Sequence, residues 1–159
     1  EVADITTLDA KTLLPSARNV TQGPVNIQMT YEGMAVKGAI EMQGKKMPIE
    51  AKGEHSFVSD GAALAVALTT MKLVPGMKAT ATTFDLQTGK PQRVMLSVIG
   101  SESVTVPAKA FEAWRVDIAS AGDTGTTSVW VEKANTRRVV KVSQMLPQGM
   151  GQLSYELTK

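Results

Sequence analysis

The chain has 159 residues, and its 17 Lys and Arg against 15 Asp and Glu give a formal net charge of +2. This length is that of one ordinary domain, and a hydrophobic share of 43% is too high for a disordered chain. The absence of Cys excludes disulfides and zinc–cysteine sites, and a single His excludes a multi-histidine metal centre. No apolar stretch is long enough to span a membrane, and the small net charge gives no argument for nucleic-acid binding.

The chain begins at Glu1 with neither an initiator Met nor a signal-like segment. We therefore expect a mature or excised piece of a protein, and the lack of Cys favours an exported bacterial one. The only seam in the pattern lies at residues 53–78, so we predict a single β-rich domain over residues 1–159.

Apolar and polar residues alternate with a period of two in the first part of the chain. The alternation predicts strands at 25–31, 36–42 and 47–51, each with one apolar and one polar face. Short turns at Glu32-Gly33 and Gly44-Lys45 separate these strands, as in an antiparallel meander.

The segment 59–76 has a helical pattern instead. Ser59 or Asp60 can cap a helix over residues 60–72, and Pro75-Gly76 ends the segment. The apolar side chains at helical spacing are Leu64, Leu68 and Met71. We expect one short helix packed on a sheet. A continuous buried strand is the alternative, because short apolar runs fit both structures.

Strand patterns return in the second part of the chain. The predicted strands are 79–86, 92–99, 102–106, 112–118, 127–132, 138–145 and 152–158. The chain is therefore predicted to be mainly β, with about ten strands and one short helix. So many antiparallel strands are expected to form a curved sheet, either a half-barrel or a barrel.

Several segments resemble the signature of a family of uncharacterised bacterial secreted domains. They are 104–116 (VTVPAKAFEAWRV), 128–133 (SVWVEK), 138–142 (RVVKV), 8–15 (LDAKTLLP) and 73–76 (LVPG). The resemblance spans most of the chain. Lys109 stands where the family pattern has glycine, so the tight turn expected there can have another shape.

The resemblance implies a curved antiparallel sheet similar to that of the LolA/LolB-type periplasmic lipoprotein carriers, and a periplasmic or secreted location in a bacterium. Such domains occur alone or as a trailing module of a larger secreted enzyme. The family brings no catalytic residue and no cofactor, so we assign none and expect a protein that is not an enzyme.

Two motifs with catalytic associations have simpler explanations. Asp123-Thr124-Gly125-Thr126 matches the active-site string of aspartic proteases, which need two such aspartates, whereas a hairpin turn needs only one copy. His55 lies near Ser59 and Asp60 in sequence, but residues so close rarely form a catalytic triad. We interpret His55 as a solvated loop residue.

Four carboxylates lie on predicted polar strand faces, where they are expected to form ion pairs rather than an acid–base couple. They are Glu41, Glu50, Asp117 and Glu132. Their expected partners on the strands are Lys37, Lys52, Arg115 and Lys133.

Many of the nine methionines fall on the predicted apolar face or beside the helix. These are Met29, Met34, Met42, Met47, Met71, Met77 and Met95. Plain core filling is one interpretation, and an adaptable hydrophobic groove is another. A copper site is a third, although no Met-x-x-Met cluster supports it.

Two hypotheses follow from different classes of protein. The first is a binding domain that holds a lipid or other apolar small molecule in the concave face of the sheet, with Leu64, Leu68, Met71 and Met77 as the groove residues. The second is a structural or interaction module that contacts the rest of a larger secreted chain. An enzyme comes third. No metal, cofactor, nucleic acid or membrane span is predicted.

Overall fold

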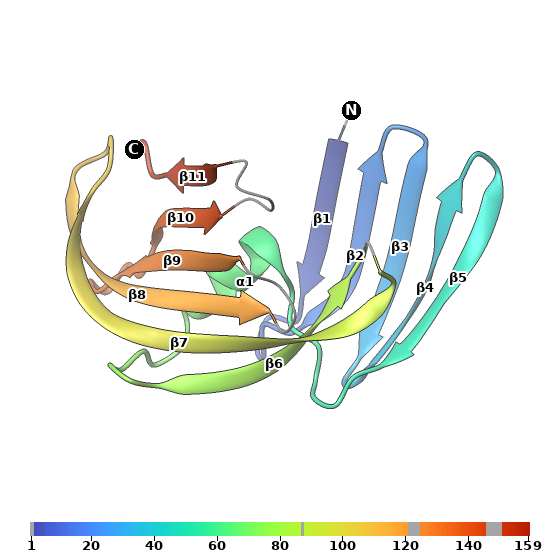
Figure 1. Ribbon diagram of the computed structural model, residues 1–159, viewed down its shortest axis with the longest axis horizontal. Helices are drawn as coiled ribbons and strands as arrows, with labels where there is room; N and C mark the ends of the chain where they lie inside the picture. Colours follow the sequence, from blue (N-terminus) through green and yellow to red (C-terminus); the bar gives the residue numbers. More distant parts are fainter. Residues whose placement is uncertain (1, 87, 121–124, 146–150) are drawn as a thin grey trace. The chain divides into compact units, whose positions relative to one another are not determined.

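The computed structural model describes residues 2–86, 88–120, 125–145 and 151–159 (Figure 1). Within these residues, eleven strands form two antiparallel sheets, one of five strands and one of six, and there is one helix. The prediction of a mainly β chain with one short helix is confirmed, and the strands are divided between two sheets. The chain has two compact units, 1–60 with 81–92 (unit 1) and 61–80 with 93–159 (unit 2). The single domain over residues 1–159 stays a prediction.

The five-stranded sheet belongs to unit 1 and follows chain order (Figure 1). Its strands are β1 (Val2–Leu8), β2 (Pro15–Gln22), β3 (Val25–Glu32), β4 (Ala35–Met42) and β5 (Lys45–Lys52). The predicted meander is confirmed over β3–β5. Its register places Ile27 opposite Ile40 and Ile40 opposite Met47, so the apolar residues share one face.

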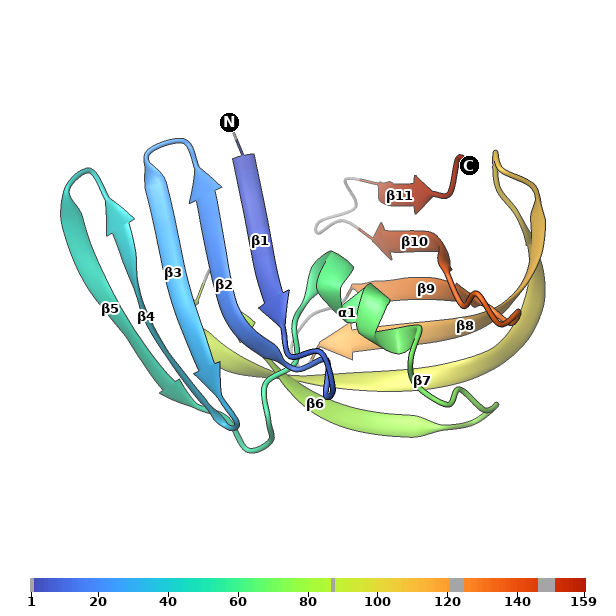
Figure 2. The same ribbon diagram turned by 180° about the vertical axis from the view of Figure 1, so that it is seen from behind.

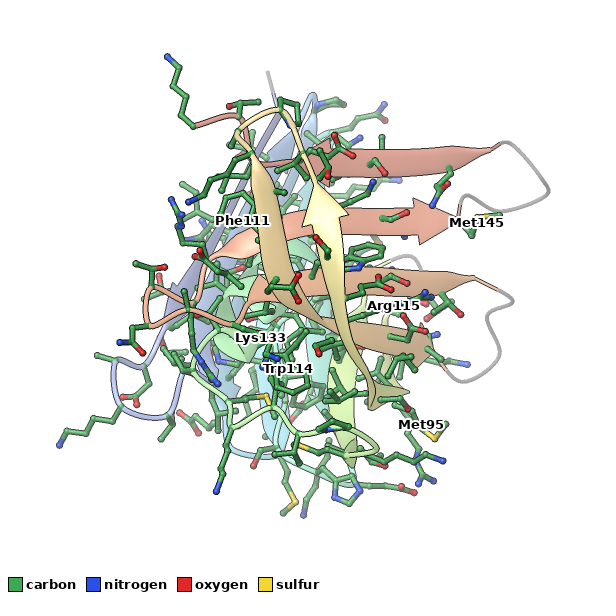
Figure 3. The ribbon with its side chains drawn as sticks, turned by 90° about the vertical axis from the view of Figure 1, so that its left-hand side faces the viewer. Met95, Phe111, Trp114, Arg115, Lys133 and Met145 are labelled. Atoms are coloured by element: carbon green, nitrogen blue, oxygen red, sulfur yellow. The ribbon has the colours of Figure 1, made fainter. Side chains whose placement is uncertain are left out.

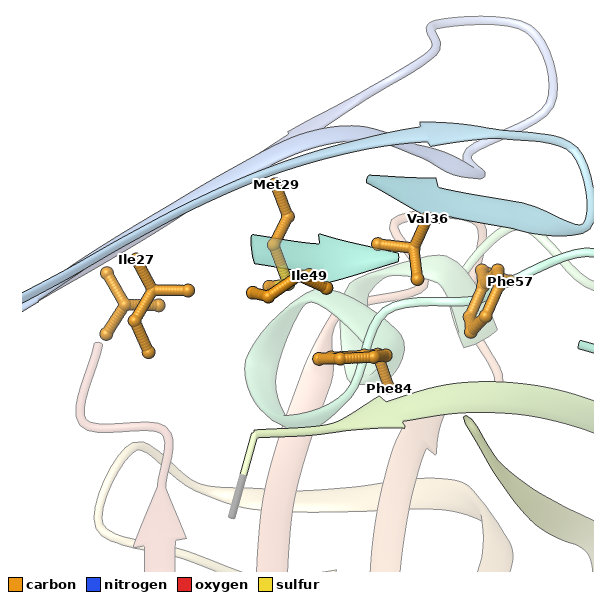
Figure 4. Packing of buried hydrophobic residues seen from close by; sticks show 7 residues of the cluster. Ile27, Met29, Val36, Ile49, Phe57 and Phe84 are labelled. Carbon is orange, nitrogen blue, oxygen red and sulfur yellow. The ribbon is translucent and has the colours of Figure 1, made fainter. Parts of the chain in front are cut away.

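That face builds the core of unit 1 (Figure 4). The buried residues are Val20, Ile27, Met29, Val36, Ile49, Phe57 and Phe84. Phe57 and Phe84 come from outside the five strands, and the Phe57 ring lies 5.7 Å from the ring of Tyr31. Burial of each large apolar side chain stabilises the fold by about 1.5–3 kcal/mol, so this cluster fixes which face of the sheet is covered.

The six-stranded sheet is a second meander, in which strands that are neighbours in sequence, from β6 to β11, are also neighbours in the sheet. Its strands are β6 (Lys78–Asp85), β7 (Lys90–Thr105), β8 (Ala110–Ser120), β9 (Thr126–Glu132), β10 (Val139–Met145) and β11 (Gln152–Glu156). β7 replaces two predicted strands, 92–99 and 102–106. A β-bulge between Val98 and Gly100 interrupts the alternation but lets the pairing with β8 continue.

Helix α1 (Gly61–Leu68) belongs to unit 2 and lies against one face of the six-stranded sheet, where it contacts β10 (Figures 1 and 2). It is shorter than the predicted 60–72. The hydroxyls of Thr69 and Thr70 donate to the carbonyl oxygens of Val66 and Ala67 at 2.7 and 2.9 Å, which satisfies the last turn. Met71 therefore lies beyond the helix, not on its face.

Candidate functional site

The four predicted groove residues have different environments within unit 2. Leu64 and Leu68 are 5% and 0% exposed, so they fill the core. Met71 and Met77 are half-buried. The Met77 carbonyl accepts a hydrogen bond from the Val98 N–H at 2.9 Å, and the Arg137 guanidinium donates to the Met71 carbonyl. A ligand groove at these residues stays a prediction, and at Leu64 and Leu68 the core-filling interpretation describes the burial better.

The apolar face of the five-stranded sheet reaches the surface at one end. Met42 and Met47 are 43% and 45% exposed, while Val25 and Ile40 are half-buried. The register places Val25 opposite Met42 and Ile40 opposite Met47, so the four side chains share one face. We call these four residues the methionine end. It is continuous with the buried face that carries Ile27.

The tight turn between β4 and β5 explains why the two methionines come together. Gln43 and Gly44 have φ values of 51° and 76°, as a two-residue turn between antiparallel strands requires. The turn puts Met42 opposite Lys45, and Met47 follows two residues later on the same face. The methionine end is therefore flanked by one exposed cation, Lys45.

A buried arginine lies on this same sheet face, in β2, where the sequence pattern predicts no strand. Arg18 is 9% exposed and lies opposite Met29 in the register. Its Nε and Nη2 atoms donate to the Asp4 carboxylate at 2.9 and 2.6 Å, and Nη1 lies 2.7 Å from Asp60 Oδ1. The hydrogen bond with Asp4 is the main cause that raises the pKa of Arg18, so the guanidinium keeps its charge. Burial likewise raises the pKa of Tyr31.

In unit 2, Trp130 of β9 lies between two cations from the neighbouring strands. The Arg115 guanidinium and the Lys141 ammonium lie 5.7 and 5.8 Å from the ring, and the register makes both residues direct neighbours of Trp130. The indole N–H donates to Glu102 at 2.5 Å. This network ties four strands of the sheet together.

Asp117 and Glu132 both form ion pairs, as expected, but the partner of Glu132 lies outside the expected set. Asp117 Oδ1 accepts from Arg115 Nε at 2.9 Å, two residues away on the same strand. Glu132 pairs with Arg138 at 3.1 Å instead of Lys133. The reason is that β9 ends at Glu132, so its carboxylate turns to the following loop, where the Thr136 hydroxyl donates to it at 2.6 Å. The Thr136 and Arg138 hydrogen bonds lower the pKa of Glu132.

The remaining predicted positions behave as structural residues. The register places Glu50 opposite Lys37 and Glu41 opposite Lys46. His55 is exposed in the segment after β5, as expected for a solvated residue. The motif that starts at Asp123 falls mostly outside the described residues.

Neither a metal centre nor a transmembrane helix is found in the described part of the chain. Among the described residues, no three or more His, Cys, Asp or Glu side chains are grouped to bind a metal ion. No helix in these residues has the length and apolar character that crossing a membrane requires.

Sequence reasoning missed the Arg18 cluster and the Trp130 network because both join residues from separate strands. The available signal for Arg18 is a charged residue two positions before Val20, in step with the apolar face. Arg115, Trp130 and Lys141 carry no local pattern at all, since only strand register makes them neighbours.

These features define a mainly β protein with an apolar sheet face in unit 1 and a charged aromatic network in unit 2. A family model described as "Protein of unknown function (DUF3108)" matches residues 2–158, and the chain belongs to this family. The predicted membership in an uncharacterised domain family is thereby confirmed. No curated protein and no solved structure matches the chain.

Proposed function

We propose that the chain is a non-catalytic, exported bacterial domain that binds a lipid or another apolar ligand on the apolar face of its five-stranded sheet. The observation that carries this proposal is the exposure of Met42 and Met47, 43% and 45%, at the end of an otherwise buried apolar face. Methionine side chains adapt to ligands of different shape, and exposed apolar patches mark binding sites more often than chance.

A periplasmic or secreted location and a likeness to LolA/LolB-type carriers belong to the same proposal. The antiparallel sheets, the single short helix of the described residues and the lack of Cys are compatible with it. The assignment as a binding protein rather than an enzyme is supported by the ion pairs of Asp117 and Glu132, which occupy the carboxylates that an acid–base reaction would need.

Charge reversal at the methionine end tests this function. We expect the double change Met42→Glu and Met47→Glu to reduce the uptake of an apolar probe dye at least about tenfold, because a ligand would have to bury unpaired carboxylates. The matched control is Met34→Glu with Met95→Glu, since these side chains are 43% and 51% exposed and lie outside the methionine end. Equal uptake by both double variants, with unchanged circular dichroism, contradicts the proposal.

The burial of Leu68 favours a second candidate function, an accessory structural or interaction module of a larger secreted chain. Leu68 is 0% exposed, as expected for a filled core without a ligand. If the module is the correct function, Leu68→Glu unfolds the chain because it buries an unpaired charge. If a ligand groove exists at the helix, Leu68→Glu and Met71→Glu remove ligand binding from a chain that stays folded.

A further inference from the structure

Unit 2 carries a surplus of positive charge, with ten Lys and Arg against six Asp and Glu in its sequence. Four of these cations gather around the connection between β9 and β10 and the turn between β7 and β8. They are Lys109, Lys133, Arg137 and Arg138. The loop 133–138 itself contains no acidic residue. We call Lys109 together with loop 133–138 the basic end.

Backbone hydrogen bonds hold this loop at the start of β8. The Lys133 N–H donates to the Glu112 carbonyl at 2.9 Å, and the Glu132 N–H donates to the Arg138 carbonyl at 2.8 Å. Glu132 is buried and already bound by Arg138 and Thr136, so its charge is compensated. Lys109, Lys133 and Arg138 are exposed, whereas Glu112, which neighbours Phe111 on β8, is one exposed acid, so the basic end is positive.

On each face of the sheet, an aromatic ring of β8 lies under one or two of these cations. Lys109 Nζ and Arg138 Cζ lie 4.9 and 5.4 Å from the centre of the Phe111 ring, and Lys133 Nζ lies 4.7 Å from the ring of Trp114. Figure 3 shows Lys133 beside Trp114. Phe111 comes three residues before Trp114 on β8, so the two rings lie on opposite faces of the sheet at the same end of the strand. The rings position the long side chains, so less conformational entropy is lost when their charged heads bind an anion.

We propose that the basic end is a docking surface for the phosphate headgroups of an anionic lipid bilayer. Basic side chains are attracted to the negative surface of such a bilayer, and the basic end presents three exposed cations. A single-stranded nucleic acid fits less well, because its bases need free ring faces and cations occupy the faces of Phe111 and Trp114. This inference goes beyond the proposed apolar-ligand binding, because the methionine end belongs to unit 1.

Co-sedimentation of the full chain with lipid vesicles tests the proposal. We expect binding to vesicles of phosphatidylglycerol and phosphatidylcholine at low salt, weaker binding at high salt, and none to phosphatidylcholine alone. The double change Lys109→Glu and Lys133→Glu should weaken this binding at least about tenfold. The matched control is Lys78→Glu with Arg93→Glu, which reverses two other exposed cations of unit 2 and should keep the binding.

Three results would overturn the proposal. Equal loss in both double variants would show that only the net charge matters, and equal binding to phosphatidylcholine would show that headgroup charge does not. Binding to single-stranded DNA but not to vesicles would assign the surface to nucleic acid.

Uptake of the apolar probe dye, measured on the same variants, reports on the methionine end and separates a failure here from a failure of the proposed function. A Lys109→Gln and Lys133→Gln variant guards against misfolding caused by the added carboxylates.

Discussion

Arg18 places a permanent charge on the apolar face of a sheet, and two carboxylates make this position tolerable. Removing a charged group from water is costly unless its hydrogen bonds are satisfied. The Arg18 side chain is 11% exposed, but those of Asp4 and Asp60 are 44% and 40% exposed, so only one member of the cluster loses most of its hydration. The cluster anchors β1 to β2 through Asp4 and holds the residue before α1 through Asp60.

A double-mutant cycle measures that anchor. Asp4→Asn should lower the free energy of unfolding by about 1–2 kcal/mol, because it removes the charge that accepts two Arg18 N–H groups and Asp4 is itself partly solvated. In an Arg18→Met background the same Asp4→Asn change should have almost no effect. Urea unfolding of the four proteins gives the comparison, and an equal cost in both backgrounds would show that Asp4 acts independently of Arg18.

Glu132 makes the free energy of unfolding depend on pH in the acidic range. Its pKa is lowered in the folded chain by the Thr136 hydroxyl and then by Arg138, so folding favours the ionised carboxylate. The resulting stabilisation is present above its ordinary pKa of 4.5 and is lost as the pH falls through the lowered value. We expect Glu132→Gln to flatten this part of the pH profile in urea unfolding. Identical profiles for the variant and the original chain would contradict this role.

At the scale of the element, β4 depends on a glycine because the neighbouring strand comes too close for a side chain. A Cβ atom at Gly38 would lie 2.0 Å from the Gln28 carbonyl oxygen and 2.9 Å from the Met29 Cα. A Cβ at Gly100 in β7 would meet nothing within 4 Å. A side chain therefore has room at Gly100 but not at Gly38.

Their replacement by alanine gives a direct comparison. Gly38→Ala should destabilise the chain by about 1–3 kcal/mol or more, because β3 and β4 must separate to admit the methyl group. Gly100→Ala should change the free energy of unfolding by less than about 0.5 kcal/mol. Thermal and urea unfolding of both variants decide the matter, and equal destabilisation would mean that the close approach at Gly38 costs nothing.

Elements with clean alternation could be predicted, and those with a local exception could not. β3–β5 follow from period two and their glycine turns. The sequence does not predict β2, because Arg18 occupies an apolar position of the alternation. Its ion pairs with Asp4 and Asp60 form only when the chain folds. β7 looked like two strands because the bulge before Gly100 shifts the pattern by one residue. The predicted helix is longer than α1, because the side chains of Thr69 and Thr70 end the helix after Leu68.

At the scale of the whole molecule, the sequence predicts which kinds of residue form the candidate site, but not where in the fold that site lies. The methionine-rich apolar face was apparent from the sequence, and two of its members, Met42 and Met47, are exposed. The burial of Leu64 and Leu68 could not be foreseen, because helical spacing shows which residues share a face but not whether that face is fully covered. Lys109 does not have a left-handed backbone, so the lysine is accommodated there without strain.

Binding of an apolar ligand is the central claim, and native mass spectrometry of the freshly purified chain tests it most directly. We predict a discrete added mass on the 16.9 kDa chain, which solvent extraction of the same sample releases as a lipid or fatty acid. The Met42→Glu, Met47→Glu variant should lack that mass. A clean 16.9 kDa species that also takes up no apolar probe dye would contradict the claim and leave the accessory module as the function.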